Sequence, residues 1–270
     1  MSSVAIPEID YPDRDGKPMS DNTKQARWIF VLYGNLLAQF RDRDDVFVAA
    51  DNLWYPVEGN NKIRQAPDVY VVFGRPKGDR GSYKQWEEGG VPLTVVFEIL
   101  SPGNERGEEP KKHLFYEEYG VEEYYVYDPD ADHLTIYTRG PRGAAFRRHN
   151  PNRFVSPRLG IRFDFGGEEM VVIGPNGQLF LSFEELKTLQ EQETTRANLA
   201  ESLAAQEAVR AKEATARAEQ ETVRAKNALA ELEEERRINL RIRELSRKQR
   251  AGVISPDELR ELVVLTNGIE

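Results

Sequence analysis

Aromatic side chains stop about two thirds of the way along the chain, and this limits most strongly what the chain can fold into. Every Trp, Tyr and Phe lies at or before Phe183, and residues 184–270 contain none. Large flat side chains supply much of the surface that a globular core buries. The sequence therefore predicts a globular part within residues 1–183, followed by a helical or interaction segment without a core of its own.

Residues 184–250 have the composition of a long helix. They are rich in Ala, Glu, Arg and Leu, without Pro or Gly. QEAVRAK at 206–212 recurs as QETVRAK at 220–226, which is a repeat of two heptads. The seam is mostly Ala and Thr, so we expect a loose dimer, a pairing within the chain or a solvated rod. This coiled-coil segment is expected over 184–251, and 252–270 is expected to hold a short helix, opened by SPDE and running through Leu262.

The order of helical and β-rich segments predicts an α/β domain over 23–183, with a mixed sheet flanked by helices. Residues 1–22 are expected to be an irregular lead-in, and SDNT at 20–23 to cap a buried helix of about 20 residues. A second helix is expected at 110–120, between an opening Pro and a closing Gly. Runs rich in Val, Ile, Tyr and Phe predict strands. These runs are 46–55, 68–73, 93–100, 123–128 and 134–138, with further strands or hairpins within 154–165 and 169–183.

The composition restricts the chemistry and the compartment. Without cysteine the chain has no disulfide, thiolate metal site or cysteine nucleophile. No basic segment followed by an apolar one stands at the N-terminus, and no run of about 18 apolar residues occurs. We therefore expect a cytoplasmic protein that does not enter a membrane.

The charge is acidic overall but has one basic stretch. The net charge of -9 divides into -6 for residues 1–183 (22 basic and 28 acidic) and -3 for 184–270 (15 basic and 18 acidic). This balance opposes nonspecific DNA binding, which rests on phosphate contacts. However, 133–163 holds seven basic residues and no acidic one, and predicts either a solvated hairpin or a surface that follows phosphates. The DNA-contact candidates are Arg139, Arg142, Arg147 and Arg148.

Glu98 stands inside a run of apolar residues. LTVVFEIL at 93–100 is typical of a strand that is buried on both faces. An isolated buried charge is too costly, so this carboxylate must be paired, protonated or bound to a cation. The alternative to a functional site is a carboxylate that is salt-bridged at the edge of the sheet.

Asp68 opens the strand run 68–73, directly after a proline. If its strand lies beside the strand of Glu98, both carboxylates can reach one divalent cation as the hard oxygen ligands that Mg²⁺ prefers. The alternative is an ordinary Pro-Asp turn. The functional interpretation of Asp68 therefore depends on Glu98.

Lys111 and Lys112 lie on the helix that follows the strand of Glu98. A lysine aimed at the carboxylates could orient an attacking water or offset charge on a scissile phosphate. Lys112 shares a helix face with Tyr116, and Lys111 shares one with Phe115, because four residues separate the members of each pair. The rotation of the helix decides which lysine faces the sheet.

Three ordered motifs resemble a known family. APDVYVVFG at 66–74, VVFEILSP at 95–102 and KKHLFYEEYGVEEYYVYDPD at 111–130 together resemble the Uma-type restriction endonucleases, a bacterial family within the PD-(D/E)XK nuclease superfamily. The resemblance covers roughly residues 25–165. It implies an α/β core of the restriction-endonuclease type.

The resemblance also implies a site. Asp68 and Glu98 would bind Mg²⁺, with Mn²⁺ as a possible substitute, and the backbone carbonyl of Ile99 would add a ligand. Leu100 stands where the superfamily usually has its lysine, and the resemblance moves that role to Lys112 on the following helix. The supporting candidates are Glu108, Tyr116 and Asp51.

Two functions follow as hypotheses. The first is a Mg²⁺-dependent endonuclease that hydrolyses DNA phosphodiester bonds, as a homodimer through the nuclease domain or the coiled coil. The second is a nuclease-like scaffold without catalysis, which acts through its tail as a binding or assembly module. The direction of Lys112, toward the carboxylates or into solvent, discriminates between them.

Overall fold

The first helix covers one face of the central sheet. The computed structural model describes residues 9–103 and 108–267, so part of the expected lead-in lies outside the described residues. Helix α1 (Thr23–Gln39) begins after Asn22, whose side chain accepts a hydrogen bond from the backbone N–H of Gln25. Its 17 residues are slightly fewer than expected, and its buried stripe includes Trp28, Leu32 and Leu36.

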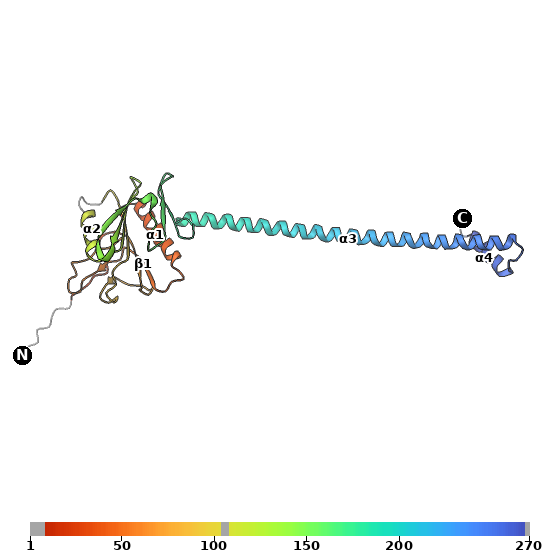
Figure 1. Ribbon diagram of the computed structural model, residues 1–270, viewed down its shortest axis with the longest axis horizontal. Helices are drawn as coiled ribbons and strands as arrows, with labels where there is room; N and C mark the ends of the chain where they lie inside the picture. Colours follow the sequence, from red (N-terminus) through yellow and green to blue (C-terminus); the bar gives the residue numbers. More distant parts are fainter. Residues whose placement is uncertain (1–8, 104–107, 268–270) are drawn as a thin grey trace, which may run out of the picture. The chain divides into compact units, whose positions relative to one another are not determined.

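Six strands form a mixed sheet in the order β1-β3-β5-β6-β7-β8. Figure 1 labels the first of them, β1, near α1. All neighbours are antiparallel except β5 and β6, which helix α2 connects. A parallel pair requires such a crossover. The elements are β1 (Val46–Ala50), β3 (Val69–Phe73), β5 (Val95–Ile99), α2 (Glu108–Glu118), β6 (Glu123–Asp128), β7 (His133–Gly140) and β8 (Ala144–His149).

Two small sheets complete the domain. One pairs β2 (Trp54–Tyr55) with β4 (Tyr83–Lys84), and the other pairs β9 (Arg162–Asp164) with β10 (Val171–Ile173). The prediction of one strand over 46–55 is wrong, because Asp51 adopts a φ of 49° and ends the extended run before β2. Strand β8 was not among the predicted strands, and its pairing with β7 makes the hairpin expected for the basic stretch.

The sheet separates two apolar layers. Side chains of α1, β9 and β10 pack on one face of it, and side chains from α2, β2 and β4 pack on the other. Strand β5 is buried along its whole length, as its apolar sequence predicts. Polar side chains on this strand are therefore held between two layers that exclude water.

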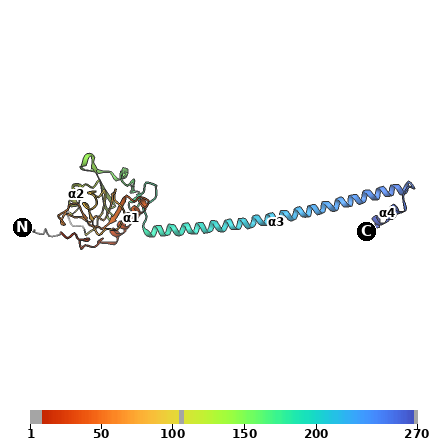
Figure 2. The same cartoon turned by 90° about the horizontal axis from the view of Figure 1, so that it is seen from below.

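The chain divides into two units, residues 1–190 and 191–270. Helix α3 (Phe183–Arg250) is continuous (Figure 2), and residues 183–237 are all exposed. The two-heptad repeat at 206–226 lies within this exposed stretch. None of the described helices combines the length and apolar composition that crossing a lipid bilayer requires.

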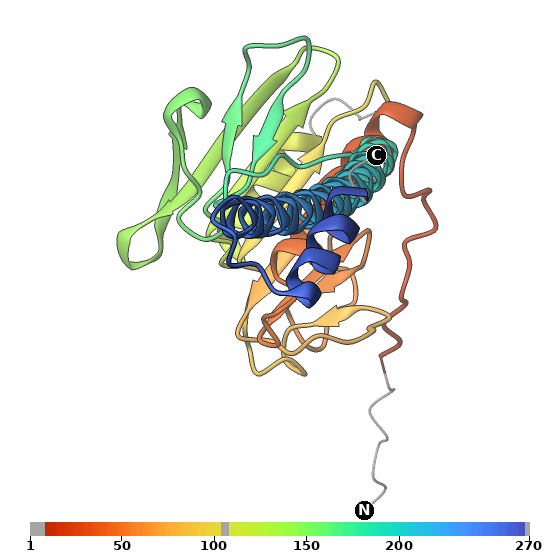
Figure 3. The ribbon, with the colours of Figure 1, turned by 90° about the vertical axis from the view of Figure 1, so that its right-hand side faces the viewer.

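Helix α4 (Pro256–Asn267) folds back beside the end of α3 (Figure 3). It runs five residues beyond Leu262, the expected end. Two ion pairs join the helices: Arg241 to Glu261 at 2.8 Å and Lys248 to Glu258 at 2.6 Å. A turn with Gly252 at a φ of 70° separates the helices.

Candidate active site

Strands β3 and β5 bring Asp68 and Glu98 together. Their antiparallel register pairs Val69 with Phe97, so Asp68, just before β3, lies opposite Glu98 of β5. The backbone N–H of Ile99 donates a hydrogen bond of 2.6 Å to Asp68 Oδ2. Glu98 is only 3% exposed, in the middle of the sheet rather than at its edge. Two carboxylates from distant parts of the sequence therefore meet in a buried place.

Helix α2 adds a lysine and a tyrosine to this place. Lys112 Nζ donates to Glu98 Oε2 at 2.8 Å, and the Tyr116 hydroxyl donates to Glu98 Oε1 at 2.5 Å. The Lys112 side chain is 14% exposed, whereas Lys111 is exposed on the same helix. Of the two lysines, the structure therefore places Lys112 at the carboxylates. Tyr116, a supporting candidate, is buried in the core and also orients Glu98.

Burial and mutual repulsion set the electrostatics of the site. Burial raises the pKa of the Asp68 carboxyl well above its usual range, and the charge of Glu98 raises it further, against the hydrogen bond from Ile99 and the charge of Lys112. Burial acts to lower the pKa of Lys112, but the charge and hydrogen bond of Glu98 outweigh it and raise that pKa. Lys112 therefore stays an ammonium ion, while Asp68 binds a proton more tightly than a solvated carboxyl.

The two acidic supporting candidates border the site without joining its hydrogen bonds. Glu108 begins α2, lies four residues before Lys112 and adds to the rise of its pKa. Asp51 lies beside Asp68 across β1 and β3, because its backbone N–H donates to the Asp68 carbonyl at 3.3 Å. Asp51 is exposed as a residue, but neighbouring groups partly desolvate its carboxyl, and this desolvation, followed by the charge of Asp15, raises its pKa.

The Ile99 carbonyl has a partner that the sequence did not reveal. Gln25 of α1 donates from Nε2 to this oxygen at 2.8 Å and accepts the backbone N–H of Asp21 at 2.8 Å. Gln25 is 6% exposed. The sequence did hold a signal for Gln25: it is a polar residue that precedes Trp28 and Leu32 at helical spacing, and so lies in line with the buried stripe of α1. Gln25 therefore fixes the position of this carbonyl.

The donor set suits a hard divalent cation. Asp68 and Glu98 supply two carboxylates, and the Ile99 carbonyl has room for a second interaction beside Gln25, since a carbonyl oxygen carries two lone pairs. Among the described residues, no group of three or more His, Asp or Glu side chains could hold a metal. Mg²⁺ fits such a set because it commonly keeps several waters and takes only one or two carboxylates.

The arginines of the basic stretch have different surroundings. Arg139 is half-buried and held against the protein surface, because its guanidinium donates to the carbonyls of Val121, Gly143 and Glu117. Arg147 and Arg148 are exposed on β8. The side chain of Arg142 lies outside the described part of the chain. Of these candidates, Arg147 and Arg148 are therefore the described side chains that extend into solvent.

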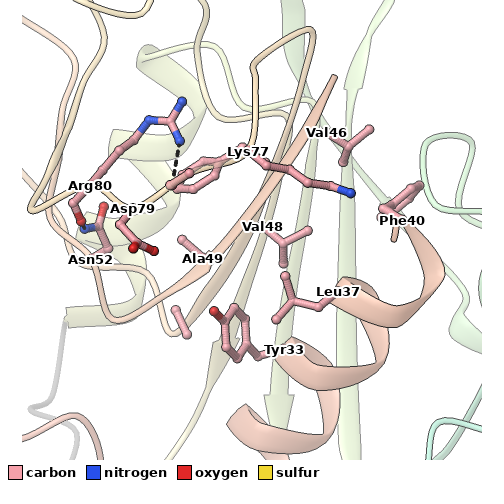
Figure 4. Close-up of a pocket in the computed structure, with 13 residues that line it drawn as sticks. Tyr33, Leu37, Phe40, Val46, Val48, Ala49, Asn52, Lys77, Asp79 and Arg80 are labelled. Carbon is pink, nitrogen blue, oxygen red and sulfur yellow. Dashed lines mark hydrogen bonds between the residues drawn. The ribbon is translucent and has the colours of Figure 1, made fainter. Parts of the chain in front are cut away.

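A depression of about 290 Å³ lies elsewhere, between α1 and the edge strand β1 (Figure 4). Tyr33 and Leu37 line it from the helix, and Lys77, Asp79 and Arg80 approach from the other side. None of the predicted site residues lines it. The depression and the carboxylate cluster are therefore separate features.

Comparison with known proteins identifies the family. The model of the Uma2 family, described as "Putative restriction endonuclease", matches residues 15–170. The chain belongs to this family, so the resemblance and the expected mixed-sheet nuclease-like core are confirmed.

Part of the chain is also similar to a solved structure. The chain is similar to a "putative nuclease belonging to DUF820" from Anabaena variabilis ATCC 29413, with 16% identity and a TM-score of 0.38. That likeness covers 56% of this chain and 84% of the other. No curated protein matches the chain.

Proposed function

We propose that this protein is a metal-dependent endonuclease that hydrolyses DNA phosphodiester bonds at Asp68, Glu98 and Lys112. The observation that carries the proposal is the 2.8 Å contact between Lys112 Nζ and Glu98 Oε2, next to Asp68. A buried ammonium beside two carboxylates is costly to maintain, and such clusters occur where a site binds charge. Membership of a family described as "Putative restriction endonuclease" supports the same class of reaction.

Each residue has a chemical task in this proposal. Asp68, Glu98 and the Ile99 carbonyl would hold Mg²⁺, or Mn²⁺ in its place. The cation would polarise the scissile phosphate and lower the pKa of a bound water. Lys112 keeps its proton, so it donates hydrogen bonds to the attacking water or to a phosphate oxygen and offsets the negative charge that develops there. Tyr116 holds the other oxygen of Glu98 and so fixes the carboxylate plane.

The exposed arginines of β8 supply the contact with the DNA backbone in this proposal. Arg147 and Arg148 lie on a strand whose described side chains include no acidic residue. Phosphate contacts of this type position a duplex without reading its sequence. Because the chain is acidic overall, binding depends on such local basic patches.

The second candidate is a scaffold that does not cleave DNA and acts through its tail. Apolar side chains on α3 favour it, because Leu199, Leu203, Leu229 and Leu232 are each more than half exposed. A coiled-coil partner or a second copy of the chain would cover them. The two candidates differ in whether purified protein cuts DNA.

Plasmid nicking tests the proposal. Supercoiled DNA is incubated with full-length protein and Mg²⁺ or Mn²⁺, and with EDTA as a blank. We expect metal-dependent nicking that is lost in Asp68→Asn and Glu98→Gln. Glu109→Gln, which removes an exposed carboxylate of α2, serves as the matched control and retains the activity. Folded wild-type protein that leaves the plasmid intact with both metals would support the scaffold candidate.

A further inference from the structure

The hydroxyl of Tyr124 is buried without a hydrogen-bond partner. Tyr124 lies on β6 and has no exposed surface, and within the described part of the chain its Oη atom contacts no donor or acceptor at hydrogen-bond distance. Buried hydroxyls are nearly always paired, because an unpaired one has lost its bond to water without compensation. An orphaned hydroxyl at this position therefore needs an explanation.

Tyr124 points from the same face of the sheet as Glu98. Strands β5 and β6 are parallel, with Val96 opposite Tyr124 and Glu98 opposite Val126. Residues that are directly paired, or that lie two apart on a strand, extend from the same face. Tyr124 and Tyr116 also pack together, with their ring centroids 5.0 Å apart, and Tyr116 is hydrogen-bonded to Glu98.

The charges around Tyr124 agree with this placement. Burial raises the pKa of its hydroxyl most, and the charges of Glu98 and then Glu109 raise it further. The hydroxyl therefore remains protonated, as a hydrogen-bond donor. The Tyr124 ring packs against His113 and Tyr116 of α2, the helix from which Lys112 reaches the same carboxylate.

We propose that Tyr124 is a positioning residue of the nuclease site, whose hydroxyl donates its hydrogen bond to a water molecule that enters together with the divalent cation. This inference rests on the proposed function. A cation such as Mg²⁺ retains several of its waters, and because their lone pairs face the cation they donate hydrogen bonds outward, to protein acceptors or to a second layer of waters. A water of that second layer can accept the hydrogen bond of the orphaned hydroxyl, which is already in place on a rigid strand. Its partner is supplied when the site is loaded.

Tyr125 provides a matched control on the opposite face of the same strand. Its hydroxyl donates to Glu123 at 2.7 Å, in a cluster that also includes Ser156. Both tyrosines are fully buried and neighbours in sequence. Their hydroxyls differ in one respect: among the described residues, that of Tyr125 has a hydrogen-bond partner and that of Tyr124 has none.

The test measures Mn²⁺ affinity by calorimetry, and stability by urea unfolding in EDTA, for full-length wild type, Tyr124→Phe and Tyr125→Phe. For Tyr124→Phe we expect Mn²⁺ binding about tenfold weaker, as for other outer-shell partners of metal ligands. Its urea midpoint in EDTA should equal or exceed that of wild type, because the variant removes a polar group that has no partner. For Tyr125→Phe we expect the reverse: a lower midpoint and unchanged Mn²⁺ affinity.

Two results overturn the inference alone. Either Tyr124→Phe binds Mn²⁺ as well as wild type does, or it loses stability in EDTA as Tyr125→Phe does, which would make its hydroxyl a structural group. Wild-type protein that binds no Mn²⁺ would instead remove the proposed metal-dependent function, and this inference with it.

Discussion

Removing Lys112 should destabilise the protein strongly, although it creates only a small cavity. The side chains of Lys112 and Glu98 are 14% and 4% exposed. Breaking a buried ion pair on one side costs about 3–5 kcal/mol, because the remaining charge stays buried without its partner. Tyr116 still donates to Glu98, so we expect Lys112→Met to lose about 3 kcal/mol, near the lower limit of that range. For a domain of this size the melting temperature would fall by about 6–12 °C.

The assay must report on the globular unit and not on α3. All three tryptophans lie before residue 90, so their fluorescence in urea follows that unit. The double variant Lys112→Met with Glu98→Gln removes both charges and keeps an acceptor for Tyr116, so it should recover to within about 1 kcal/mol of wild type. A loss below about 1 kcal/mol in Lys112→Met, as measured for exposed ion pairs, would refute the reasoning. So would a double variant that is no more stable than Lys112→Met.

Three further predictions concern pH, DNA and assembly. The raised pKa of Asp68 contributes stability that is fully present below the unfolded pKa of roughly 3.9 and is lost as the pH rises through the folded pKa. Asp68→Asn should therefore raise the urea midpoint in EDTA more at about pH 7.5 than at about pH 4. Equal effects at the two pH values would contradict this. Arg148→Ala should reduce the slope of log Kd for DNA against log salt by about 0.9, whereas Arg139→Ala should lower stability and leave the slope unchanged. The exposed two-heptad repeat on α3 predicts a homodimer in sedimentation at tens of micromolar. A monomer at that concentration would count against the homodimer.

The main carboxylates could be predicted because burial makes a charged residue conspicuous. Glu98 interrupts an apolar strand, and Asp68 opens the β-rich run that proves to be its neighbour. Residue spacing alone left the choice between Lys111 and Lys112 open, because it depends on how α2 is rotated against the sheet, and the family resemblance was what pointed to Lys112. The contacts between these residues therefore needed the structure.

Other features depend on tertiary context that no local pattern contains. Asp51 ends a run of strand-forming residues through a positive φ, which its side chain alone does not require. Strand β8 is mostly exposed and lacks apolar alternation, so its pairing with β7 defines it. Gln25 and the Ile99 carbonyl are 74 residues apart in the sequence. Tyr124 cannot be told from the neighbouring tyrosines by sequence. It differs from Tyr125 because, among the described residues, its hydroxyl has no hydrogen-bond partner.

The nicking rates of Lys111→Ala and Lys112→Ala under single-turnover conditions with Mg²⁺ test the central claim most directly. The two lysines are adjacent on α2, and of these two described side chains Lys112 contacts Glu98 whereas Lys111 is exposed. We expect Lys112→Ala to slow nicking by at least about a hundredfold, as when a charge-stabilising donor is removed, and Lys111→Ala to nick at the wild-type rate. Equal rates for the two folded variants, or no nicking by wild-type protein, would contradict a nuclease site at Asp68, Glu98 and Lys112.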